Sequence, residues 1–466
     1  MDPEQAKKRQ TLRVLFSEAM MVLSVIIIMT VLIMITSGYW INQNFEVERR
    51  GMLEVFSSPT SADIIVDGES DWMAKTNNSK IVSSGEHMVT ISKDGYGDWS
   101  KKITIEEGLM YRLPYVRLFP NEREAEKVGE ANARLSSVSQ DRSLMLLANN
   151  TTTWKILHLG DDVTVSDYDV KNVLSEVSGG ADAVNNISGI EWNGDNNKAL
   201  VKFGNEWALL DLKDASKSLN LSKTFGMSFG TVKFFDKSGE NLLVVENGEL
   251  RKINVREQAI SKILASKVTN FNIYEDSVVY VAGDLETGKK VSVLKKIDDE
   301  PIALLDAQGG KVFAALTKSY RDTYLTVVED GKLSLYKGQL PRNKNDQNSF
   351  EKVFDTEVGF IPERIKVGFG GAFVIMSNGR NIVALDMESE DVTKFEVEND
   401  KIGWLDNYLL YVVDDNGDMV VYDFDGLNRR ELSKNASQRL SATISEDKWL
   451  YYFSDGWLVR ENLIIK

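Results

Sequence analysis

The chain contains no cysteine and two histidines, His87 and His158, among its 466 residues. The absence of cysteine excludes disulfides, thiolate metal ligands, thiol nucleophiles and a lipid-carrying cysteine. Two histidines without cysteine also exclude the ordinary zinc sites. A long exported region without disulfides is more typical of a bacterial surface than of a eukaryotic secretory route. We therefore interpret the glycosylation-like Asn149-Asn150-Thr151 as a chance match.

Basic residues are outnumbered, with 55 Lys and Arg against 70 Asp and Glu and a formal net charge of −15. Residues 1–18 carry four basic and three acidic side chains, so the acidity belongs to the rest of the chain. Such a surface repels phosphate backbones, and we expect no nucleic-acid partner. Apolar residues make up 42% of the chain, enough to form cores in two or three domains.

Charge is absent between Ala19 and Phe45, and the run "AMMVLSVIIIMTVLIMI" begins this segment. About 20 apolar residues cross a bilayer core of about 30 Å as a helix. We predict a cytoplasmic tail at residues 1–18 and a transmembrane helix at residues 19–41, in contact with the lipid bilayer. Tyr39 and Trp40 would then lie at the membrane interface, where aromatic rings are favoured.

The basic residues before the apolar run predict the orientation. Lys7, Lys8, Arg9 and Arg13 are expected to stay in the cytoplasm, so the C-terminal domains are extracytoplasmic. A cleaved signal peptide, with cleavage near residues 36–38, is the alternative. The apolar run exceeds the roughly 7–15 residues of a signal peptide, which favours the anchor. The tail is too short for an output domain, so the function is expected outside the cell membrane.

Residues 51–119 alternate apolar and polar side chains in short runs separated by Asp-Gly and Glu-Gly turns, as half-buried strands do. This segment resembles the PEGA domain family, and the matching residues are Gly51 to Val55, Ser58-Pro59, Ala62, Val66-Asp67-Gly68, Gly85-Glu86-His87, Gly95-Tyr96 and Gly108. The Pro-Glu-Gly-Ala core of that family appears as Pro59-Thr60-Ser61-Ala62. The resemblance implies a small β-sandwich without a catalytic residue. Trp72 and Trp99 could form a binding patch, but we expect them to pack as buried aromatics, the commoner role of such side chains.

Residues 120–134 are polar and charged, and we predict a linker or short helix there. Residues 135–466 then repeat a β-run, a polar turn and a second β-run about every 44 residues, which predicts a β-propeller. We count eight blades, with seven as the alternative, from second strands that begin near Leu144, Ala199, Leu242, Val278, Val312, Ala372, Leu409 and Trp449. The overall prediction is a mainly β protein with one transmembrane helix.

Five Asn-Gly or Asp-Gly pairs occupy the same hairpin in five repeats, where two residues with positive φ are expected. They are Asn247-Gly248, Asp330-Gly331, Asn378-Gly379, Asn416-Gly417 and Asp455-Gly456. Residues 419–433 resemble the blade motif of TolB-type propellers, in which an apolar strand runs into Asp-Gly-x-Asn-x-Arg-x-Leu. That resemblance implies a binding platform. The long polar loop within residues 337–353 is the predicted recognition segment.

The stretch "FGMSFG" contains a literal G-x-S-x-G around Ser228, the pattern of a nucleophile elbow. The elbow needs a helix after the serine and a histidine later in the chain. Residues after Gly230 alternate like a strand, and His87 and His158 both precede Ser228. We therefore interpret the stretch as an interblade loop.

Three other patterns resemble ligand-binding motifs or charged binding segments. Asp414, Asn416 and Asp418 resemble the start of a calcium loop, but Met419 replaces the required glycine and Asp425 the required glutamate. Residues 368–373, "GFGGAF", resemble a phosphate loop but open a strand, so we predict a bend. The acidic run at residues 388–391 is interpreted as a solvated turn. We assign no catalytic, cofactor-binding or metal-ligating residue.

The sequence therefore predicts an extracytoplasmic, membrane-anchored envelope protein that acts as a non-catalytic binding or scaffold module. An envelope protein or glycan on the propeller face is the expected partner, and no cofactor is expected. One alternative is a carbohydrate-active enzyme with paired carboxylates in the axial channel, about 5–10 Å apart. The other is a subunit of a larger membrane complex.

Overall fold

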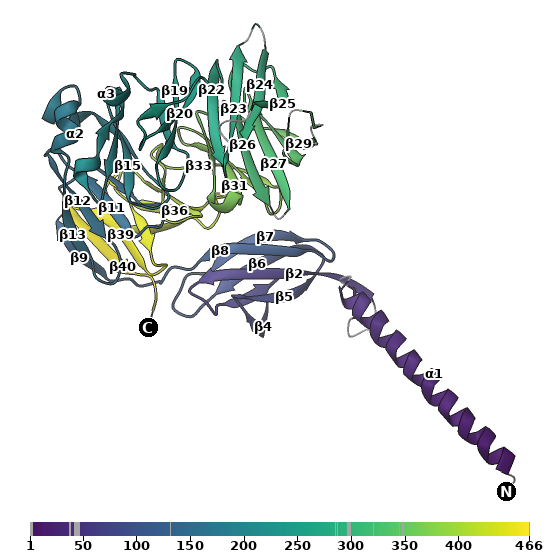
Figure 1. The fold of residues 1–466 in the computed structure, drawn as a ribbon. Helices are drawn as coiled ribbons and strands as arrows, with labels where there is room; N and C mark the ends of the chain where they lie inside the picture. Colours follow the sequence, from purple (N-terminus) through teal and green to yellow (C-terminus); the bar gives the residue numbers. More distant parts are fainter. Residues whose placement is uncertain are drawn as a thin grey trace. The chain divides into compact units, whose positions relative to one another are not determined.

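The computed structural model describes residues 3–36, 39–41, 47–130, 132–284, 286, 288–295, 300–319, 321–343, 345–346 and 349–465. The chain divides into two compact units, Met1–Asn121 and Glu122–Lys466. β-Strands dominate both units, as expected, and one long helix, α1, opens the first (Figure 1).

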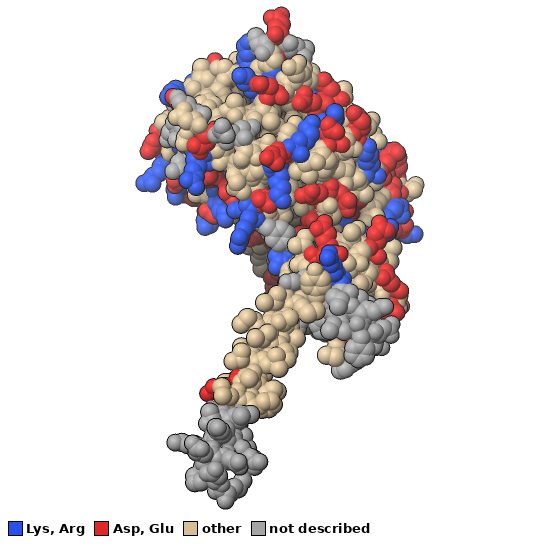
Figure 2. Space-filling view, turned by 90° about the vertical axis from the view of Figure 1, so that its right-hand side faces the viewer, with Lys and Arg blue, Asp and Glu red and all other residues tan. Residues whose placement is uncertain are grey.

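Helix α1 (Pro3–Thr36) contains the apolar run. Its segment Leu15–Met34 has a mean hydropathy of 2.4, and none of that segment is buried inside the structure. Figure 2 shows the described part of this helix as an almost uncharged rod. By length and composition it can cross a membrane, and a signal sequence near an N-terminus has the same properties.

The helix ends before the predicted boundary at residue 41. Tyr39–Ile41 form strand β1, which pairs antiparallel with Val47–Arg49 at the start of β2 (Val47–Ser58). The guanidinium of Arg49 lies 5.4 Å from the ring centroid of Tyr39. The prediction that residues 39–41 continue the helix was therefore wrong, because these residues are held by strand pairing.

The rest of unit 1 is a sandwich of two four-stranded sheets. One sheet contains β1, β2, β5 (Asn78–Ser83) and β8 (Met110–Arg117), and the other contains β4 (Glu69–Lys75), β3 (Asp63–Val66), β6 (Gly85–Ser92) and β7 (Trp99–Ile105). Alternate residues of β7 are buried, as the period of two predicts. Trp99 is 1% exposed and packs edge-on against Tyr115, which confirms its buried role. The side chain of Trp72 lies outside the described residues.

Unit 2 contains eight four-stranded antiparallel sheets in the part of the chain that the structure describes. The first four are β10 (Leu135–Val138), β11 (Leu144–Ala148), β12 (Thr153–His158) and β13 (Thr164–Asp169); β14 (Ile187–Trp192), β15 (Lys198–Phe203), β16 (Glu206–Asp211) and β17 (Leu219–Asn220); β18 (Thr231–Phe234), β19 (Asn241–Glu246), β20 (Glu249–Asn254) and β21 (Ala259–Ile260); and β22 (Val268–Tyr274), β23 (Ser277–Asp284), β24 (Gly288–Lys295) and β25 (Ile302–Ala307).

The other four are β26 (Val312–Ser319), β27 (Asp322–Glu329), β28 (Lys332–Gly338) and β29 (Glu351–Glu357); β30 (Arg364–Val367), β31 (Phe373–Asn378), β32 (Asn381–Asp386) and β33 (Val392–Glu396); β34 (Gly403–Trp404), β35 (Leu409–Val413), β36 (Met419–Asp423) and β37 (Arg430–Ser433); and β38 (Thr443–Ser445), β39 (Trp449–Ser454), β40 (Trp457–Asn462) and β9 (Ala125–Glu130). Short helices occupy the connections: α2 (Lys171–Glu176), η1 (Gly180–Asn186), η2 (Ala215–Lys217), α3 (Leu221–Phe225) and η3 (Phe369–Gly371).

The sheets follow one another around a closed ring. Buried clusters join each of the first five sheets to the next. Phe373 stacks on Phe424 to join the sixth sheet to the seventh, and the Ile444 N–H donates to the Leu405 carbonyl at 2.7 Å between the seventh and eighth. A further cluster joins the eighth sheet to the first. The first strands β10 and β14, β22 and β26, and β26 and β30 contact each other between successive sheets, and four first strands line one central hollow, so the first strands are innermost. This arrangement is a β-propeller.

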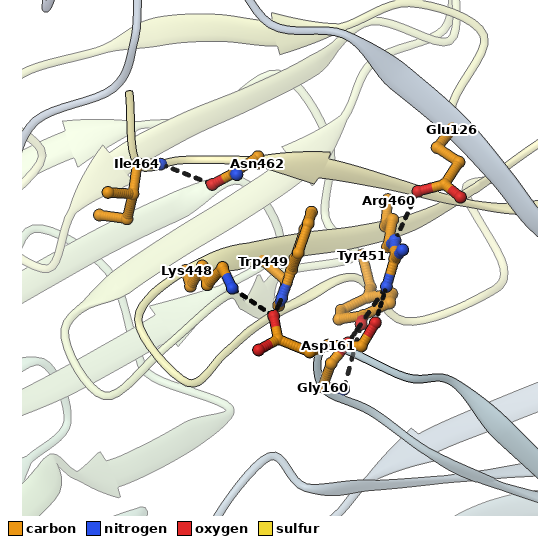
Figure 3. Close-up of polar contacts among 9 residues, drawn as sticks. All are labelled: Glu126, Gly160, Asp161, Lys448, Trp449, Tyr451, Arg460, Asn462 and Ile464. Atoms are coloured by element: carbon orange, nitrogen blue, oxygen red, sulfur yellow. Dashed lines mark hydrogen bonds and ion pairs between the residues drawn. The ribbon is translucent and has the colours of Figure 1, made fainter. Parts of the chain in front are cut away.

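The ring closes through β9, which comes before the first sheet in sequence but pairs with β40 in the last. Arg460 of β40 donates to Glu126 of β9 at 2.8 Å and to the Asp161 carbonyl of the first sheet at 2.7 Å (Figure 3). Tyr451 donates to the Gly160 carbonyl at 2.7 Å. The prediction of a linker or helix at residues 120–134 was wrong for residues 125–130. These residues form the fourth strand of the last sheet, because their backbone pairs with β40 near the other end of the chain.

Two details of the repeat also differ from the prediction. Val312 begins the first strand of the fifth sheet, whereas the repeat alignment placed it in a second strand. All five Gly-containing pairs do lie between second and third strands. However, both residues have positive φ only in the pairs that begin with Asn247, Asp330 and Asp455. In the pairs that begin with Asn378 and Asn416, the glycine alone has positive φ. Those two turns differ because Gly379 is followed by Arg380 within the turn, and Asn416 lies in a longer loop.

Candidate binding site in the propeller channel

The structure does not bring Ser228 together with a histidine. Ser228 is exposed in the loop between α3 and β18, so a helix precedes it and a strand follows, the reverse of a nucleophile elbow. His158 is exposed at the end of β12. His87 belongs to the other unit.

His87 holds a turn in unit 1. Its Nδ1 lies 2.7 Å from Asp67 Oδ2, and its Nε2 lies 2.8 Å from the Ser83 carbonyl. The other oxygen of Asp67 accepts the backbone N–H of Met88 at 2.8 Å. The hydrogen bond from His87, followed by that from Met88, lowers the pKa of Asp67. Asp67 and Gly68 both have positive φ, at +52° and +82°, as in a tight Asp-Gly hairpin. The hydrogen bonds to the Asp67 carboxylate hold this hairpin in place.

The other patterns also have structural roles. Asp414 Oδ1 accepts the backbone N–H groups of Asn416 and Asp418, each at 2.8 Å, and so closes its own loop. Within the described residues, no group of three or more His, Asp and Glu side chains is arranged to hold a metal ion. In the acidic run, Glu390 accepts a hydrogen bond of 3.0 Å from Tyr324 of the neighbouring sheet. This turn therefore also links two sheets of the ring.

Three hollows meet along β30, one of the innermost strands. Their volumes are about 470, 270 and 410 Å³. The second is lined by β18, β22, β26 and β30, which places it in the central channel. The largest, which we call the channel mouth, is lined by the turns between β10 and β11, β30 and β31, and β34 and β35. These are first-to-second-strand turns, so the channel mouth lies at the end of the ring opposite the Asn-Gly hairpins.

The Gly-rich stretch at residues 368–373 forms one wall of the channel mouth. A Cβ on Gly368 would lie 2.4 Å from the Phe373 ring, so glycine is needed here for space. The Phe373 ring is 1% exposed and is stacked between Phe424, at 4.3 Å, and Trp404, at 5.6 Å. The stretch forms a bend, as the sequence predicted, and the bend contains the 3₁₀ turn η3. It lies beside Lys366 in the wall of the channel mouth.

Lys366 lies on β30. Its ammonium lies 4.2 Å from the ring centroid of Trp404, a cation–π distance. Its side chain is accessible to water, yet no carboxylate of the described residues pairs with it. Burial among the channel walls, followed by the positive charges of Arg142 and Lys233, lowers its pKa to about 8. Strongly perturbed groups of this kind in clefts are candidate functional residues.

Arg142, Asp406 and Phe369 complete the channel mouth. Arg142 extends from the first sheet to the seventh, where it donates to the Leu405 carbonyl at 3.1 Å and to Asn407 Oδ1 at 2.7 Å. Asp406 accepts the backbone N–H groups of Tyr408 and Leu409. Phe369 is 59% exposed and meets the Tyr408 ring edge-on at 6.2 Å. The site therefore combines a lysine without a carboxylate partner, a fixed arginine and an exposed aromatic ring.

The same hollows bear on the alternative of paired carboxylates. Among the described residues that line them, the channel mouth has Asp406, the second hollow has Glu363 and the third has Glu275. Each of these hollows thus offers one acidic group. General acid and base chemistry on a glycoside requires two that flank one bond, so the alternative gains no support here.

Sequence reasoning did not find Lys366, Trp404 and Arg142, because the three residues lie in different repeats. The available signal was positional: all three belong to first strands or to the turns that follow them, which face the channel. The predicted recognition loop instead connects β28 and β29, the third and fourth strands of its sheet. Its role in recognition stays a prediction.

Parts of the chain are similar to known proteins. The PEGA domain model matches residues 50–117. Similar solved structures include the C-terminal WD40 domain of Sif2, with 12% identity, a TM-score of 0.47 and coverage of 73% of this chain and 99% of that one. The Cps50 (Swd1) β-propeller domain of Myceliophteria thermophila has 10% identity, a TM-score of 0.42 and coverage of 73% and 100%. No curated protein matches the chain.

Proposed function

We propose that this protein is a membrane-anchored binding module of the cell envelope, whose eight-bladed propeller binds its partner at the channel mouth. In this proposal residues 1–18 are a cytoplasmic tail, the apolar part of α1 spans the membrane, and the PEGA-like sandwich to residue 119 is a spacer. The propeller lies on the extracytoplasmic side. Its partner is an envelope protein or glycan.

The observation that carries this proposal is the combination of Lys366 and Phe369 at one hollow. A lysine without an anionic partner beside two other cations is unfavourable for folding. A phenylalanine that is 59% exposed buries little apolar area and adds little stability. Two residues that line the same hollow of a rigid ring and contribute little to the core are well placed to contact a ligand.

The channel mouth can be tested by site-specific photocrosslinking. We expect a photoreactive phenylalanine analogue at position 369, in cells that make the full chain, to give a discrete crosslinked species. The same analogue at Val353, which is 39% exposed on the fourth strand β29, is the matched control. Equal crosslinking at both positions, or none at 369, would contradict the channel mouth as the binding site.

The orientation can be tested by protease treatment of intact cells that carry an epitope at each end of the chain. We expect external protease to remove the C-terminal epitope and to leave a short N-terminal fragment in the membrane. The physical reason is the basic cluster before the apolar helix, which is retained on the cytoplasmic side. Protection of the C-terminal epitope until the membrane is lysed would overturn the extracytoplasmic placement.

A further inference from the structure

We infer that the channel mouth binds an organic carboxylate carried on an apolar or aromatic group, with the ammonium of Lys366 taking the anion and Phe369 covering the apolar part. This inference rests on the proposed function and specifies its ligand. The protein as a whole carries a net charge of −15, and acidic and basic side chains are interspersed over the face shown in Figure 2. Within this acidic protein, the channel mouth presents a lysine that pairs with no carboxylate of the described residues and lies against an aromatic ring.

The number of available charges favours a carboxylate. Arg142 already donates to the Leu405 carbonyl and to Asn407, and Lys233 pairs with Glu191 at 3.1 Å. Lys366 thus offers one compact positive charge, and the carboxylate of Asp406 lines the same hollow. A phosphate dianion generally binds several cations or a bidentate arginine. The charged residues that line the hollow are Arg142, Lys366 and Asp406, a net charge of one positive unit, which a single negative charge matches.

The apolar part of the ligand follows from the aromatic residues. Trp404 lies under the ammonium and Phe373 lies behind Trp404, so the cation is held against a rigid stack. Phe369 is exposed at the rim, beside Tyr408. The volume of about 470 Å³ admits one or two side-chain-sized groups and excludes a folded domain. An aromatic ring next to the carboxylate would pack on Phe369 and remove apolar surface from water.

The charge on Lys366 makes binding depend on pH. The charged groups near it are Arg142 and Lys233, which disfavour its protonation, and the lining residues Arg364, Glu363 and Asp406. Because its pKa is about 8, the ammonium is present below that pH and is lost above it. Affinity for a carboxylate is therefore nearly constant between about pH 5, where the ligand is still ionised, and about pH 8, and it falls as pH rises further, by up to about tenfold per pH unit.

The test uses the full chain in detergent micelles with N-acetyl-phenylalanine, its uncharged amide and inorganic phosphate as probes, followed by saturation-transfer NMR and calorimetry. We expect the acid to bind and the amide and phosphate to bind at least about tenfold more weakly, as loss of a charge-assisted hydrogen bond predicts. Lys366→Gln should lose the acid to a similar extent. Lys366→Arg should keep it and remove the fall above pH 8. Lys202→Gln, which alters another lysine over a tryptophan at 5.4 Å, is the matched control.

Lost binding by Lys366→Gln can be distinguished from unfolding by its melting temperature. Removing a disfavoured charge should leave that temperature no lower than that of the parent. Equal binding of acid and amide, unchanged binding by Lys366→Gln, or preference for phosphate would overturn the inference. If position 369 crosslinks a partner while the acid does not bind, the ligand class is wrong and the proposed function stands. If the acid binds but no crosslink forms, the partner-binding function fails instead.

Discussion

Two prolines in β9, Lys127→Pro with Val128→Pro, are expected to lower the free energy of unfolding of the propeller by about 3 kcal/mol or more. Lys127 pairs with Val459 of β40, and Val128 is the extra residue at a register shift beside that pair. Proline has no N–H and is not accommodated in a paired strand, so the two prolines disrupt the pairing of β9 with β40. The loss also separates Glu126 from Arg460 and weakens the closure shown in Figure 3. Thermal and denaturant unfolding of the full chain, followed by tryptophan fluorescence, measures the change.

The matched control is Lys127→Ala with Val128→Ala, which keeps the backbone ladder and removes the same side chains. Val128 is half-buried against the cluster that joins the last sheet to the first, so the alanine pair has a smaller cost of its own. The difference between the two double variants isolates the backbone pairing. If the proline pair costs no more than the alanine pair, β9 does not close the ring.

Gly368→Ala is expected to destabilise the propeller by roughly 1–3 kcal/mol, a cost of overpacking. Gly368 has φ −74° and ψ 176°, which any residue adopts, so the cost is entirely steric. The added Cβ would meet the Phe373 ring at 2.4 Å. Phe373 cannot move away, because it is held between Phe424 and Trp404. Since Trp404 also supports Lys366, probe binding at the channel mouth should fall together with stability.

Gly370, two residues along the same bend, is the matched control. It has φ +60° and no atom within 4 Å of an added Cβ, so its requirement is conformational. Asparagine tolerates this left-handed region, and Gly370→Asn should therefore be nearly neutral where Gly368→Asn is not. A second check is Gly368→Ala combined with Phe373→Leu, which should cost less than the sum of the two changes. Additive costs would show that the ring and the glycine do not compete for space.

Local patterns predicted much of the fold because each reports a short-range requirement. The alternation in residues 51–119 predicted half-buried strands, and alternate residues of β7 are buried. The Asn-Gly pair at residues 247–248 predicted a hairpin with two positive φ angles, which Asn247 and Gly248 have. The same reasoning failed where the partner lies far along the chain. Residues 125–130 include three charged side chains and resemble a linker, but their backbone pairs with a strand more than 300 residues away. Val312 was placed in the wrong strand because both neighbouring strands are equally apolar.

The channel mouth could not be read from any one segment. "GFGGAF" indicated a bend, and the bend is present, but its importance comes from Phe373, which needs Gly368 for space and Trp404 from the next repeat for support. Lys366 resembles any lysine in a surface strand. Its pKa falls to about 8 because the surrounding channel walls desolvate it and because the ring brings Arg142 and Lys233 near it. That proximity joins residues 224 positions apart in the printed sequence.

The amino-acid sequence by itself determined the apolar helix, the strand-rich composition, the repeat and the absence of cysteine chemistry, because periodicity and residue type act over a few neighbouring residues. The tertiary structure alone decided which strand closes the ring, which residues face the channel and which charge is left without a carboxylate partner. These depend on the distances between side chains from different sheets. Electrostatic and packing energies follow those distances and not separation along the chain.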